Sequence, residues 1–160
     1  MKNKLRIVSV VVDVAMFLVL ALVVITPYLL TSRFGTLERS DLFLGWNAGT
    51  WHQNLGWLLT GMMVLHVILN FKWVMATAKN FKKISKASKS QFVIMLLLFV
   101  TMTASIVSGA MWGAAGRDAT DCIRMVHTLT SWAAVWVVGI HIGVHFARFL
   151  SFFEAHAAKK

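Results

Sequence analysis

The sequence predicts an all-α integral membrane protein, a four-helix bundle with up-down-up-down topology and both termini in the cytoplasm. The first observation is composition: 58% of the 160 residues are hydrophobic and 14% are charged, whereas soluble domains average roughly 45–50% and 25%. The second is a set of four apolar runs, each as long as the roughly 20 residues that a bilayer-crossing helix needs. The third is the distribution of Lys and Arg between those runs. We therefore expect one domain over residues 1–160, with helices at about 7–30, 52–75, 91–113 and 127–150.

The first predicted helix follows Lys2, Lys4 and Arg6, and so resembles a signal peptide. It is longer than the apolar region of a signal peptide, and no small-residue cleavage site follows it. We therefore expect it to be retained in the membrane. Pro27 lies in its last turn, where a helix can end or bend at low cost.

Basic residues predict the orientation of the helices. Short cytoplasmic loops carry an excess of Lys and Arg, and most of the 16 basic residues lie at the chain ends and between the second and third helices. The same asymmetry explains the net charge of +10 without a nucleic-acid partner, which would require basic residues gathered on one exposed face. We interpret the basic connection as a topology determinant that touches anionic membrane lipid; a docking patch for a partner protein is the alternative. Its lysines are Lys79, Lys82, Lys83, Lys86 and Lys89.

Four histidines repeat one interval. His52 and His66 are 14 residues apart on the second helix, and His127 and His141 are 14 apart on the fourth. Fourteen residues advance a helix by roughly 21 Å and return to the same face at the 3.5-residue period of a supercoiled bundle. In the predicted topology both helices run from outside to inside. His52 is then expected level with His127, and His66 level with His141 nearer the cytoplasm.

Two imidazoles at one depth are the ligands that a six-coordinate haem iron needs, one on each axial side. The two pairs therefore predict two b-type haems, held non-covalently because the chain has one cysteine, Cys122, and no Cys-x-x-Cys-His sequence. Filling both axial positions favours electron transfer over substrate chemistry. For any single histidine the alternative is an interhelical hydrogen bond.

Other polar residues on these helices leave alternatives open. His145 follows His141 by one turn and competes with it as a ligand. Alternatively, His145 donates a hydrogen bond to a haem propionate or lines a quinone pocket. For Asp13 we favour a helix-end residue directed towards water, with proton acceptance as the alternative. Three cations are candidate propionate partners and equally expected as interfacial anchors. They are Arg124, Lys72 and Arg148.

The histidine segments resemble a known family, the flavinylation-associated cytochromes. Segments 52–57 (HQNLGW) and 66–73 (HVILNFKW) are similar to the second helix of that family, and 127–132 (HTLTSW) and 141–145 (HIGVH) to its last helix. Phe71 stands where a tryptophan is expected. The resemblance spans roughly residues 5 to 150, and the helical plan is also similar to the cytochrome b subunits of membrane-bound hydrogenases and formate dehydrogenases. The family resemblance implies b-type haem, a prokaryotic cytoplasmic membrane, and electron exchange with quinone or with an extracytosolic flavin-bearing or iron–sulfur protein.

The leading hypothesis is a dihaem b-type cytochrome that carries electrons between a quinone pool and a redox partner, as an electron-transfer subunit of a larger complex rather than a stand-alone enzyme. One alternative is a metal-ion transporter or sensor in which His141 and His145 form an i,i+4 metal pair. Another is a membrane anchor with a purely structural haem. A haem spectrum separates the metal hypothesis from the other two.

Overall fold

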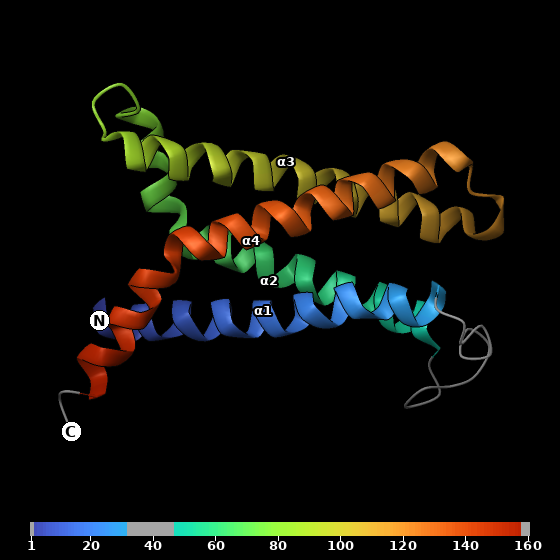
Figure 1. The fold of residues 1–160 in the computed structure, drawn as a ribbon, viewed down its shortest axis with the longest axis horizontal. Helices are drawn as coiled ribbons and strands as arrows, with labels where there is room; N and C mark the ends of the chain where they lie inside the picture. Colours follow the sequence, from blue (N-terminus) through green and yellow to red (C-terminus); the bar gives the residue numbers. More distant parts are fainter. Residues whose placement is uncertain (1, 32–46, 158–160) are drawn as a thin grey trace. The chain divides into compact units, whose positions relative to one another are not determined.

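The computed structural model describes residues 2–31 and 47–157, and their side chains except those of 2–6, 28–31, 117 and 146–157. The described chain is helical. It comprises α1 (Lys2–Thr31), α2 (Ala48–Lys79), α3 (Lys86–Ala115), a short 3₁₀ turn η1 (Gly116–Asp118) and α4 (Asp121–Ala157) (Figure 1).

All four α-helices are long and apolar enough to cross a membrane. The qualifying spans are Ile7–Pro27, Ala48–Lys79, Lys86–Ala115 and Asp121–His145. Large apolar side chains are exposed on every helix, among them Phe17, Ile68, Val100 and Trp136. In a bilayer these side chains cost nothing to expose, because lipid tails are as apolar as leucine. The all-α prediction is confirmed over the described residues, and the four apolar helices support a multi-pass membrane protein.

The helices extend beyond the apolar runs that predicted them. Hydropathy marks only the segment that lies in hydrocarbon, whereas helical hydrogen bonding continues until a cap supplies another partner for the backbone. The Ser85 side chain accepts a hydrogen bond from the Ser88 backbone N–H, and α3 begins at Lys86. α3 ends at Ala115, and its C-cap is Gly116, whose φ of 57° suits glycine and whose N–H donates to the Trp112 carbonyl.

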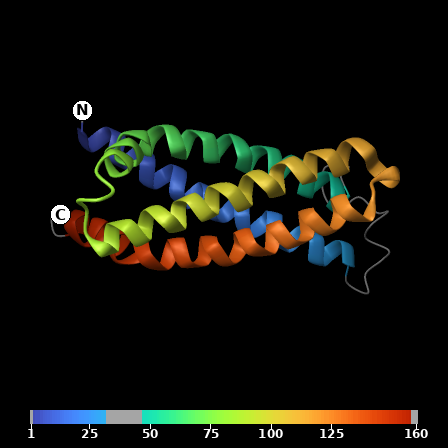
Figure 2. The same cartoon turned by 90° about the horizontal axis from the view of Figure 1, so that it is seen from above.

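The chain divides into two compact units, Met1–Trp73 and Val74–Lys160. In the first unit α1 and α2 are antiparallel, because Asp13 contacts His66 while Thr26 contacts His52. In the second unit α3 and α4 lie side by side (Figures 1 and 2), linked by a 2.6 Å hydrogen bond between the hydroxyls of Ser105 and Ser131.

Candidate functional site

His52 of α2 is held against the last turns of α1. Its Nδ1 lies 3.0 Å from the Val23 carbonyl oxygen and 2.9 Å from Thr26 Oγ1. In an α-helix the Val23 carbonyl normally accepts from the N–H four residues later, but that residue is Pro27, which has no N–H. The carbonyl accepts instead from the Thr26 hydroxyl, at 3.0 Å, and from the His52 ring. Because Pro27 has no N–H, the Val23 carbonyl is left to accept a hydrogen bond from His52.

His66 of α2 is held by a carboxylate. Its Nδ1 donates to Asp13 Oδ1 of α1 at 2.7 Å, and the side chains are 28% and 42% exposed respectively. From the sequence alone we favoured Asp13 as a residue directed towards water. The structure instead makes it the hydrogen-bond partner of a predicted ligand. Its position inside an apolar helix was the signal, since intramembrane ionisable residues are functional candidates.

His127 of α4 is held by α3 within the second unit. Its Nδ1 donates to the Ser105 carbonyl at 2.9 Å, and Ser108 Oγ lies 3.5 Å from the same nitrogen. Gly109 makes this approach possible, because a Cβ there would lie 2.8 Å from His127 Cε1 and 3.0 Å from Nδ1. The Trp112 ring meets the imidazole edge-on, with 5.7 Å between ring centroids. Among these four α3 residues, Gly109 is the one whose residue type signals a close approach.

The three contacts define the same tautomer. A carbonyl or carboxylate oxygen accepts and cannot donate, so Nδ1 carries the proton in His52, His66 and His127. A neutral imidazole protonated at Nδ1 has its lone pair on Nε2. Metal-ligating histidines characteristically donate their other ring N–H to a carboxylate, a backbone carbonyl or water. All three side chains therefore have the hydrogen-bonding pattern of ligands that bind through Nε2.

His141 and His145 lie together on α4. Their ring centroids are 4.7 Å apart, with the planes tilted by 51°. Both are partly buried. This proximity is what one-turn spacing predicts, and the choice of His141 over His145 as ligand stays a prediction.

The candidate propionate partners differ in their surroundings. Arg124 Nη1 lies 3.9 Å from Asp121 Oδ1, and its guanidinium carbon lies 5.9 Å from the centre of the Trp112 ring. Lys72 is exposed on α2. The side chain of Arg148 lies outside the described residues. The guanidinium of Arg124 is thus oriented by two neighbours in its own unit.

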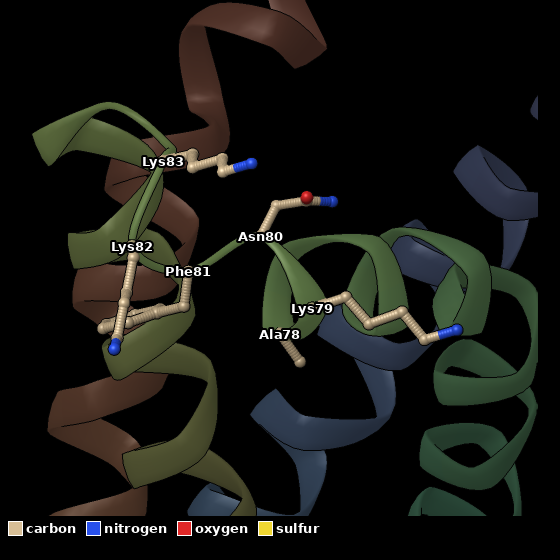
Figure 3. A pocket seen from close by; sticks show the side chains of 6 residues that line it. All are labelled: Ala78, Lys79, Asn80, Phe81, Lys82 and Lys83. Atoms are coloured by element: carbon tan, nitrogen blue, oxygen red, sulfur yellow. The ribbon is translucent and has the colours of Figure 1, made fainter.

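The basic connection between α2 and α3 forms an open surface pocket of about 370 Å³, lined by residues 78–83. The ammonium groups of Lys79, Lys82 and Lys83 spread apart instead of converging (Figure 3). Phe81 packs against Phe92 with ring centroids 5.7 Å apart, and Lys89 Nζ lies 5.8 Å from the centre of the Phe81 ring. Dispersed cations suit a surface that meets many anionic headgroups better than a site for one anion.

Two further findings bear on the site. Among the side chains that the structure describes, no three of His, Cys, Asp or Glu form a group that could hold a metal ion; axial haem ligation takes two imidazoles. No family model matches the chain, and neither a curated protein nor a solved structure does.

Proposed function

We propose that this chain is a dihaem b-type cytochrome that carries electrons across a prokaryotic cytoplasmic membrane, between a quinone pool and a redox partner protein. The observation that carries the proposal is the shared state of His52, His66 and His127. Each donates its Nδ1 proton to an oxygen on the neighbouring helix of its own unit. A histidine that only joins two helices can donate through either ring nitrogen, whereas a ligand that binds through Nε2 must donate through Nδ1.

In this proposal His52 and His127 hold one haem, and His66 and His141 hold the other. The pairing rests on the equal 14-residue intervals in the sequence, and the donor set of neutral imidazoles suits b-type haem. When bound, the haem supplies one-electron chemistry, while the protein supplies ligands, orientation and a dry environment. The apolar helices exclude water, and the Nδ1 acceptors of His52, His66 and His127 hold these three rings in one orientation. The up-down bundle and cytoplasmic termini belong to the same proposal.

The resemblance of the histidine segments to flavinylation-associated cytochromes supports this function and suggests an extracytosolic flavin or iron–sulfur partner. A membrane anchor with structural haem is separated from an electron carrier by adding a quinol analogue to the oxidised protein. An electron carrier becomes reduced, and an anchor does not. Membership of the family belongs to the same proposal.

An absorption spectrum of the purified protein tests the proposal directly. Protein expressed with ample haem supply is expected to give a reduced-minus-oxidised spectrum of six-coordinate haem b, with two haems per chain by extraction. The haems should be removed by acidic solvent extraction, because no covalent attachment sequence is present. Protein that lacks haem under these conditions would overturn the proposal.

The 4.7 Å separation of the His141 and His145 rings favours a second candidate, a metal-ion site on α4. The two functions make opposite predictions for His145→Ala. A cytochrome with His141 as ligand keeps both haems in this variant, whereas a metal-ion site loses zinc binding. Haem content and equilibrium dialysis with zinc, both on detergent-solubilised protein, distinguish them. Loss of one haem in His145→Ala, with both retained in His141→Ala, would make His145 the ligand.

A further inference from the structure

The Nδ1 acceptors of the three histidines differ in charge. His52 and His127 donate to backbone carbonyls, which are neutral dipoles. His66 donates to the side chain of Asp13, which lies inside the apolar span Ile7–Pro27. The contact is also the shortest of the three, at 2.7 Å against 3.0 Å for His52 and 2.9 Å for His127. Short length is characteristic of hydrogen bonds that involve a charged group.

A carboxylate acceptor changes the chemistry of an imidazole ligand. Drawing the Nδ1 proton towards a negative oxygen raises the electron density and basicity of the ring, and therefore of Nε2. A more basic ligand stabilises the ferric state of a haem iron more than the ferrous state, because the ferric state carries the greater positive charge. The effect is large in an apolar helix pair, where the effective dielectric constant is below that of water.

A purely structural role would not require a charge at this position. An ionisable residue within a membrane span is costly, and Thr26 contacts the His52 ring with a neutral hydroxyl. Serine or threonine at position 13 would offer His66 an acceptor at lower cost. A structural role alone therefore does not explain the negative charge of Asp13.

We propose that Asp13 is a positioning residue for His66 that lowers the reduction potential of the haem ligated by His66. The inference rests on the proposed function. In this proposal α1 contributes no histidine, but through Asp13 it controls the reduction potential of one of the two haems. His52 and His127 donate to carbonyls, so the other haem receives no comparable contribution from these contacts.

Potentiometric titration of Asp13→Asn tests the proposal. Asparagine preserves the size of the side chain and an acceptor oxygen, but removes the charge. One haem is expected to shift to a more positive potential while both remain bound, and the unshifted haem serves as a reference within the same molecule. Asp13→Ser offers a second neutral acceptor and should shift the same haem in the same direction.

Asp118→Asn is the matched control. It also removes one carboxylate, from an exposed side chain in η1. The shift in Asp13→Asn should clearly exceed any shift in this control. Asp13→Leu removes the hydrogen bond altogether, and it should weaken binding of one haem by about 10–100-fold, the usual cost of losing an outer-shell partner.

The outcomes separate this inference from the function on which it rests. If the wild-type protein holds two haems and neither neutral variant shifts a potential more than Asp118→Asn does, Asp13 does not tune the site and the proposed function stands. Wild-type protein without haem would overturn both. Nitrogen NMR of isotope-labelled histidine gives an independent readout, because the chemical shift of the His66 Nδ1–H reports its hydrogen bond to Asp13 and should change in Asp13→Leu. An unaltered signal would contradict the positioning role.

Discussion

Replacing His66 with alanine is expected to remove one of the two haems from the purified protein and leave the other in place. His52→Ala should remove the other one instead. Each substitution deletes one axial ligand, and the two positions are roughly 21 Å apart along α2, so the losses should be independent. Haem content per chain and the low-temperature absorption spectrum, which resolves two overlapping haem bands, measure both outcomes.

The control for this series is Gln53→Ala, which truncates an exposed polar side chain adjacent to His52 on the same helix. It should keep both haems. His66→Gly tests the ligand role more directly, because added imidazole should restore the lost haem band by occupying the vacated axial position. If His66→Ala keeps both haems, His66 is not a ligand and its hydrogen bond to Asp13 has another purpose.

Gly109→Ala is expected to displace the His127 ring and lower the occupancy of the haem that His127 ligates. The added Cβ would lie 2.8 Å from His127 Cε1, so the ring or the helix must move. Moving the ring stretches the 2.9 Å hydrogen bond to the Ser105 carbonyl that orients it. Overpacking of this kind costs about 1–3 kcal/mol, offset by about 0.5–1 kcal/mol from replacing a helical glycine with alanine. Thermal unfolding and haem content of the solubilised protein measure the two effects.

Gly139→Ala makes the same change on α4, where nothing lies within 4 Å of the new Cβ. Position 139 lies about 200° around the helix from His141. The Gly139→Ala protein should therefore keep both haems and gain the small stability that alanine brings. Equal behaviour of the two alanine variants would contradict the role given to Gly109. A greater loss of haem in Gly109→Val than in Gly109→Ala would support it, because valine fills more of the space taken by the imidazole.

The helices were predictable because their signal is local. A run of about 20 apolar residues is sufficient to indicate a membrane-spanning helix, and each of the four predicted helices is present. Their ends were not predictable to the same degree. α2 begins at Ala48 and ends at Lys79, beyond the expected 52–75, since polar residues at a membrane surface remain helical while the backbone bonds continue.

The repeated interval of the candidate ligands is visible in the sequence, because each 14-residue spacing lies within a single helix; their ligand role stays a prediction. Their hydrogen-bond partners were not predictable. Val23 and Ser105 contribute backbone carbonyls, and a carbonyl has no residue-specific signature. Pro27 does carry one, since a proline inside a helix leaves the carbonyl four residues earlier without its usual donor. That rule points to Val23 as an acceptor, although not to the histidine that would use it.

Asp13 shows most clearly what the sequence decides and what the tertiary structure decides. The sequence by itself determined that the first membrane helix contains a carboxylate and that the second contains histidines at a repeated interval. Only the tertiary structure decided that this carboxylate contacts His66, because the contact depends on how α1 and α2 are rotated about their own axes and how far each is shifted along the other. Periodicity within one helix contains no information about either quantity. The packing of the two helices sets both, and with them the environment of a predicted ligand.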